Sequence, residues 1–127
     1  MQLISDAGRL TIPADGAGVH WVEHLRVADL SVGTYSIPAG GTDTQQPHTE
    51  DEIYVITAGR ATLVAGPGAV ALDGGDPDDT ATQRQPVQPG SVVYVAAGEA
   101  HRFVGITEDF AALVLFAPPE ESRAGQR

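Results

Sequence analysis

At 127 residues the chain is long enough for one domain with a hydrophobic core and too short for two. Its formal net charge is −10 and it has no lysine, so its surface repels phosphate backbones and nucleic acid is not expected as a partner. The absence of cysteine excludes disulfides, thiolate metal sites and a cysteine nucleophile.

Alternation of apolar and polar residues with period two, which is typical of strands, recurs along the chain, whereas helical periodicity is hard to find. Residues 21–38 are predicted to form one long strand, or two strands with a break near Asp29. Short strands rich in branched residues are expected further along, at 52–57, 60–65, 69–72, 91–96, 101–107 and 110–117. Many short strands separated by Gly- and Pro-containing turns predict an all-β sandwich or barrel.

Residues 73–85 are polar and include four Asp, and we expect an exposed acidic loop there because the spacing of an EF-hand calcium loop is missing. Residues 118–127 follow the last apolar strand, have nothing to bury and are predicted to be a mobile tail. The barrel domain should therefore span 1–117. The chain contains no apolar run of about 18 residues, so no membrane span is predicted. Residues 1–10 do not resemble a signal peptide, and the expected location is therefore the cytoplasm.

The most informative stretch lies between residues 46 and 59. On a strand, Gln46, His48 and Glu52 point to one side if the intervening turn keeps parity. His101 stands at the start of a later predicted strand, just after a turn. Two imidazoles and one carboxylate are the ligands of non-haem iron sites, and Mn, Ni, Co or Zn also accept them. These residues predict one divalent metal ion, held by His48, Glu52 and His101 with Gln46 as the fourth ligand.

These residues stand within two spaced motifs that resemble the motifs of the cupin superfamily. The first reads Gly40-x5-Gln46-x-His48-x3-Glu52-x6-Gly59, and the superfamily's own form is G-x5-H-x-H-x3,4-E-x6-G. The second reads Gly90-x5-Ala96-x-Gly98-x2-His101-x3-Gly105, and its form in the superfamily is G-x5-P-x-G-x2-H-x3-N. The spacing is kept at every element, and the resemblance covers about residues 21–117.

The resemblance implies a double-stranded β-helix, or jelly-roll barrel, with a metal inside the barrel and a small molecule as ligand or substrate. It also implies a homodimer, since cupins often pair. The superfamily's second His, its Glu and its motif-two His fall on His48, Glu52 and His101. Its first His falls on Gln46, a neutral oxygen donor, and this departure predicts a weaker fourth ligand.

Alternatives remain open for several of these positions. Gln46 can be a ligand or a polar barrel residue that bonds a metal-bound water, and Glu50 shares parity with His48 and can replace Glu52 as the carboxylate. His20 and His24 on the first strand are more often surface or structural histidines. Residues that share inward parity with the ligands can line a substrate pocket or simply pack in the core: Tyr54, Ile56 and Phe103.

The sequence leaves the chemistry at the metal undecided. One hypothesis is an enzyme, a metal-dependent oxygenase (such as a dioxygenase), isomerase or lyase acting on a small polar or aromatic molecule. The other is a non-catalytic sensor or storage protein that binds a small ligand, which the exchange of an imidazole for Gln46 favours. A third is a metal-free barrel whose polar cluster is a hydrogen-bonded network. No Ser-His-Asp arrangement or nucleotide-binding loop is present.

Overall fold

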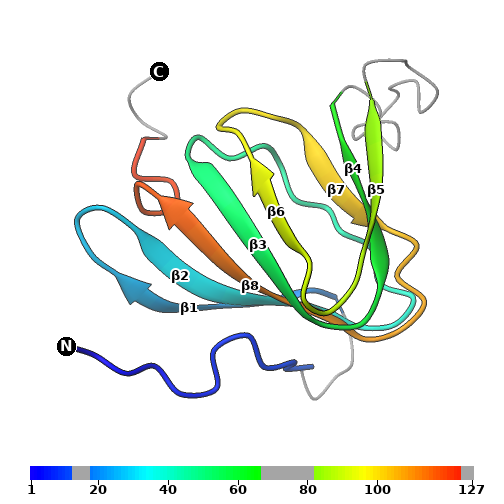
Figure 1. Cartoon of the computed structure of the whole chain (residues 1–127), viewed down its shortest axis with the longest axis horizontal. Helices are drawn as coiled ribbons and strands as arrows, with labels where there is room; N and C mark the ends of the chain where they lie inside the picture. The colour runs from blue at the N-terminus through cyan, green and yellow to red at the C-terminus, as the bar shows by residue number, and fades with distance from the viewer. Residues whose placement is uncertain (13–17, 67–81, 124–127) are drawn as a thin grey trace.

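Two facing antiparallel sheets make up the protein, as the computed structural model in Figure 1 shows; it describes residues 1–12, 18–66 and 82–123. The larger sheet has the strand order β1-β2-β8-β3-β6, and the smaller one has the order β5-β4-β7. The strands are β1 (His20–Arg26), β2 (Ser31–Ile37), β3 (Asp51–Ala58), β4 (Ala61–Ala65), β5 (Gln83–Val87), β6 (Val92–Val95), β7 (His101–Val104) and β8 (Phe110–Ala117). The described residues include no helix long and apolar enough to cross a membrane.

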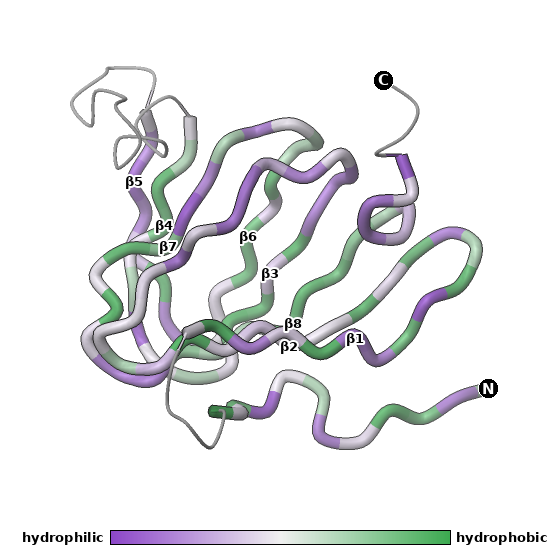
Figure 2. Tube along the Cα trace, turned by 180° about the vertical axis from the view of Figure 1, so that it is seen from behind, coloured by the Kyte–Doolittle hydropathy of each residue, from purple (hydrophilic) through white to green (hydrophobic). Residues whose placement is uncertain are grey.

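The predicted all-β fold, a double-stranded β-helix, is confirmed. The stretch 21–38 forms two strands, β1 and β2, which pair as a hairpin with a register shift between Glu23 and Leu25. The predicted strand at 69–72 and most of the acidic loop lie outside the described residues. The end of that loop was predicted wrongly, because residues 83–85 belong to β5. This strand lies at the edge of its sheet and is mostly hydrophilic (Figure 2), so it lacks the alternation that marks the other strands.

The hydrophobic core fills the space between the two sheets. Along β3 Glu52, Tyr54 and Ile56 are buried and face the interior as their parity predicts, whereas Asp51, Ile53 and Thr57 are exposed. Tyr54 and Phe110 each pack a ring against Phe103, with 4.8 Å between ring centroids in both pairs. The described apolar surface outside the core includes Val92 and Tyr94 on the edge strand β6.

Segments before the first strand and after the last one cover parts of the larger sheet. On the outer face, the amide of Gly8 donates to Thr34 Oγ1 on β2 at 2.7 Å, and the Thr57 hydroxyl on β3 donates to the Gly8 carbonyl. At the other end, Pro119 is buried and the amide of Glu120 donates to Ser31 Oγ at 2.9 Å. The expectation that the C-terminal segment has nothing to bury is therefore wrong for residues 118–123.

Candidate metal centre

Three side chains converge inside the barrel, between the two sheets. Glu52 comes from β3, His101 opens β7, and His48 lies on the irregular segment before β3. Each offers one ligand atom, and the three atoms lie within 4.8 Å of one another. Glu52 and His101 are each only 2% exposed and His48 is partly buried, so two of the three groups are almost entirely withdrawn from water. An arrangement of two imidazoles and one carboxylate has the composition of a divalent metal site.

The hydrogen bonding of His101 fixes which of its ring nitrogens faces the cluster. Nδ1 lies 2.8 Å from the carbonyl oxygen of Glu99, which can only accept, so Nδ1 carries the hydrogen. Nε2 therefore has its lone pair on the side of the cluster, where it lies 3.0 Å from Oε1 of Glu52 and 3.0 Å from the Tyr54 hydroxyl. Within the described residues this buried Glu52 oxygen receives no hydrogen bond. Two electron-rich atoms in contact call for a cation or a proton between them.

The pKa of His101 is shifted upward, as its contact with Glu52 predicts. Burial disfavours the charged imidazolium, but the close, negatively charged carboxylate of Glu52 outweighs burial and raises the pKa above its ordinary value. A carbonyl that orients the remote ring nitrogen is the usual companion of a metal-binding histidine. A proton and a metal ion would thus compete for the same place.

The turn of the second motif positions His48. The amide of Gly98 donates to the His48 carbonyl at 2.7 Å, and the amide of Ala97 donates to the Asp51 carboxylate at 2.9 Å. Asp51 is exposed, as expected of a solvated turn acid. The turn of the second motif thus holds the segment from His48 to Asp51 in the first motif in place.

The structure does not bring Gln46 into the cluster: its side chain is exposed, and Gln45 turns inward in its place. The Gln45 Oε1 atom lies 3.2 Å from Nε2 of His48 and accepts a hydrogen bond from the Tyr54 hydroxyl at 2.9 Å. The parity argument fails here because residues 41–48 form no strand, so alternation cannot be extended through Pro47.

Glu50, the alternative carboxylate ligand, binds the backbone of the C-terminal segment instead. It is only 1% exposed, and its two oxygens accept hydrogen bonds from the amides of Glu121 at 2.6 Å and Arg123 at 3.1 Å, while the Thr49 hydroxyl also donates to it. Burial opposes ionisation of Glu50, but these hydrogen bonds outweigh it and lower the pKa. Glu50 therefore anchors the C-terminal segment and stays outside the cluster.

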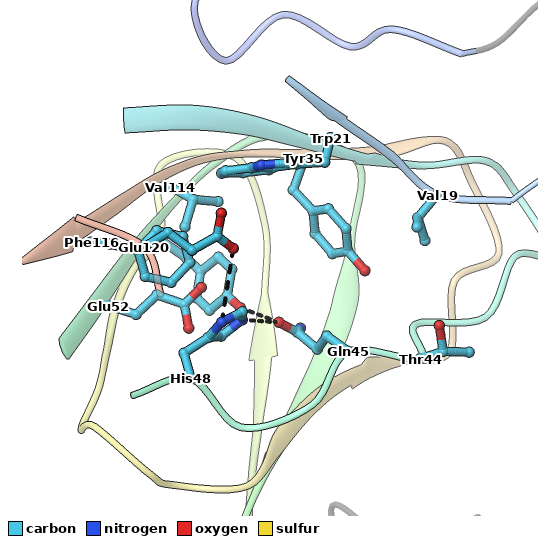
Figure 3. Close-up of a pocket in the computed structure, with 11 residues that line it drawn as sticks. Val19, Trp21, Tyr35, Thr44, Gln45, His48, Glu52, Val114, Phe116 and Glu120 are labelled. Carbon is cyan, nitrogen blue, oxygen red and sulfur yellow. Dashed lines mark hydrogen bonds and ion pairs between the residues drawn. The ribbon is translucent and has the colours of Figure 1, made fainter. Parts of the chain in front are cut away.

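A cavity of about 220 Å³ adjoins the cluster (Figure 3). Of the predicted pocket residues, Tyr54 lines it, whereas Ile56 and Phe103 are fully buried in the core behind it. His20 and His24 line a separate hollow on the outer face, where His24 Nε2 lies 2.6 Å from Thr34 Oγ1. The remaining walls were not identified from sequence: Val19, Trp21, Tyr35, Thr44, Gln45, Val114, Phe116 and Glu120.

Glu120 reaches the cavity from the anchored C-terminal segment. Its Oε2 atom lies 3.9 Å from His48 Nδ1, on the side of the imidazole away from Gln45 (Figure 3). Burial raises the pKa of Glu120 to about 7, and the negative charges of Glu121 and Glu23 add to this. Sequence reasoning missed Glu120, because no local pattern in 118–123 shows that the segment folds back onto the barrel.

Trp21 lies flat across Gly33 of the neighbouring strand β2. A Cβ atom on Gly33 would lie 2.3 Å from the indole and 2.7 Å from the Val22 carbonyl, so only glycine fits. We expect Gly33→Ala to displace the indole and to destabilise the protein by about 1–3 kcal/mol, the range of overpacking changes. Fluorescence of Trp21, which is the sole tryptophan, and thermal unfolding measure the two effects. An unshifted emission spectrum with unchanged stability would contradict this packing.

Comparison with known proteins gives one clear sequence relative. No model of a known protein family matches the sequence. A protein of Streptomyces coelicolor described as uncharacterized protein SCO3923 is 42% identical over 106 residues, covering 84% of this chain and 84% of that protein.

Solved structures match the fold at low sequence identity. An RmlC-like cupin protein from Desulfovibrio desulfuricans aligns with a TM-score of 0.66 and 14% identity, covering 94% of this chain and 98% of that one. An RmlC-like cupin family protein from Methanocaldococcus jannaschii, described as having a double-stranded β-helix fold, aligns with a TM-score of 0.61 and 14% identity, covering 92% and 87%. At such identities the likeness shows the shared fold.

Proposed function

We propose that the chain, which has the cupin fold and belongs to one family with the Streptomyces coelicolor protein, binds one divalent metal ion through His48, Glu52 and His101. The contact between Glu52 and His101 carries this proposal. It leaves a buried carboxylate oxygen without a donor and turns a lone pair toward it, at an energetic cost that a bound cation would remove.

The ligand set suits Fe, Mn, Ni, Co or Zn and leaves a divalent ion with net positive charge. Such an ion, when bound, polarises a donor atom of a small molecule, the chemistry that an oxygenase, isomerase or lyase requires. The chain's own residues supply the surroundings. Gln45 contacts the His48 imidazole and the Tyr54 hydroxyl contacts the His101 imidazole. Apolar walls limit access of water, and the Glu120 carboxylate faces the same cavity, where it can exchange a proton with a bound molecule.

Metal content measured on purified protein tests the site. We expect about one ion per chain after removal of metal with a chelator and reconstitution, and at least a 100-fold weaker affinity, roughly, in His48→Ala and His101→Ala, because each removes a ligand. His24→Ala is the control, since this histidine lies on the outer face. Stoichiometric metal in both ligand variants would rule the proposal out.

A non-catalytic binding protein is the second candidate, and the place of Gln46 favours it. With Gln46 exposed, the cluster offers three strong ligands instead of the superfamily's four, which suits a weaker metal site. Iron-loaded protein separates the candidates. Oxygen uptake or product formation that depends on an added small molecule indicates an enzyme, and thermal stabilisation by that molecule without turnover indicates a binding protein.

A further inference from the structure

We infer that the cavity beside the cluster accepts a compact aromatic or similarly apolar ring, and that it discriminates against sugars and other polyhydroxylated molecules. The inference deepens the proposed function, because the metal would bind the ligand's single donor group. The volume of about 220 Å³ is appropriate for a molecule with one ring.

Aromatic side chains form a continuous wall from the cavity mouth to the cluster. Trp21 meets Tyr35 and Phe116 edge-on, with ring centroids 6.4 and 6.1 Å away. Phe116 in turn meets the His48 ring edge-on at 4.8 Å. Val19 and Val114 complete the apolar lining. A ring placed among them gains edge-to-face contacts and is guided along the wall toward His48 (Figure 3).

Three polar side chains of the cavity wall, those of Tyr35, Gln45 and Tyr54, are already hydrogen-bonded. The Tyr35 hydroxyl donates to Asp43 Oδ1 at 2.7 Å, and Gln45 Nε2 donates to Asp43 Oδ2 at 2.6 Å. The Tyr54 hydroxyl donates to Gln45 Oε1. A sugar carries a hydroxyl on nearly every carbon, and the hydroxyls that face the apolar wall or the side chains of Tyr35, Gln45 and Tyr54 would lose water without gaining a partner. The network therefore selects against polyhydroxylated ligands.

Charge adds a second criterion. Glu52 and Glu120 face the cavity, and none of its described lining residues is Lys or Arg. Arg26 does not line the cavity, and it binds the Glu23 carboxylate and the Glu120 carbonyl. A phosphate or a second carboxylate on the ligand would meet negative charge without a cationic partner. The favoured ligand is thus a ring with one donor group.

Trp21 provides the measurement, because the sole tryptophan of the chain lines the cavity. Benzyl alcohol and myo-inositol are the probes: both are six-membered rings, one apolar with a single hydroxyl and the other hydroxylated at every carbon. Each is titrated into metal-free and zinc-loaded protein while tryptophan emission is recorded. Benzyl alcohol should cause a saturable change with a Kd on the order of 1 mM, as expected for so small a ligand, and myo-inositol should cause none.

Two valine variants show where the probe binds. Val19→Asn puts a polar group on the wall and should weaken benzyl alcohol binding by about tenfold. Val22→Asn is the control, because Val22 is exposed on the outer face. Binding of myo-inositol as tight as that of benzyl alcohol, or equal effects of the two variants, would overturn the inference. Zinc content of the same samples tests the proposed function separately, so a protein that binds the ring but retains no zinc would overturn only the metal site.

Discussion

Glu52→Gln should abolish metal binding and, at the same time, make the metal-free protein more stable. The carboxylate of Glu52 is buried and one of its oxygens has no donor, so its desolvation is uncompensated without a cation. A Gln amide carries no charge and can donate to the lone pair of His101 Nε2. We expect a gain of about 1–3 kcal/mol in the free energy of unfolding of the metal-free protein. Residues that serve a binding site commonly make the unliganded protein less stable.

Glu50→Gln is the matched control, because Glu50 is an equally buried glutamate two residues away with both oxygens hydrogen-bonded. This change replaces an acceptor with a donor that faces backbone amides, so it should destabilise the protein by about 1–3 kcal/mol and leave metal content unchanged. Denaturant unfolding of metal-free samples and metal analysis of reconstituted ones give both quantities. A destabilised Glu52→Gln protein, or one that still binds metal fully, would contradict the role of Glu52 described above.

Gly59→Ala should be among the most damaging single substitutions in the barrel. Gly59 joins β3 to β4 with φ of +75°, a conformation that L side chains rarely adopt. A Cβ atom there would lie 2.2 Å from the Asp109 carbonyl oxygen and 3.0 Å from the Phe110 Cα, both of which are backbone atoms. Strain and the steric clash together should cost about 3 kcal/mol or more.

Gly40→Ala separates the two causes. Gly40 has nearly the same φ, +77°, but a Cβ atom there would have nothing within 4 Å, so only backbone strain of about 1 kcal/mol applies. Unfolding in denaturant compares the variants directly. Equal losses of stability at the two positions would show that backbone conformation alone, and not the close contact with Asp109, requires glycine at position 59.

The fold was predictable because its signals are local. Residues 110–117 were predicted as a strand and form β8 with the same bounds, and Glu52, Tyr54 and Ile56 of β3 face inward as alternation requires. Alternation fails as a guide where the chain leaves a strand. It predicted Gln46 in the site, whereas the irregular backbone before Pro47 turns Gln45 inward.

Two further features of the site depend on contacts between distant parts of the chain. Trp21 lines the cavity only because Gly33 on the adjacent strand leaves room for its indole. Glu120 reaches His48 only because Glu50, 71 residues before Glu121, binds the backbone of the C-terminal segment. No periodicity or motif in 118–123 encodes such pairings, so sequence reasoning identified the three converging residues and Tyr54 but missed the other walls of the cavity.

The attachment of residues 118–123 to the barrel determines how a ligand can enter and leave the cavity. Three backbone amides, those of Glu120, Glu121 and Arg123, are bound by the side chains of Ser31 and Glu50 and by no strand partner. Breaking a few such hydrogen bonds costs far less than unfolding two sheets, so this wall can open while the barrel stays intact. These amides should exchange with deuterium faster than those of β3 and β8, and a ligand that closes the cavity should slow them first.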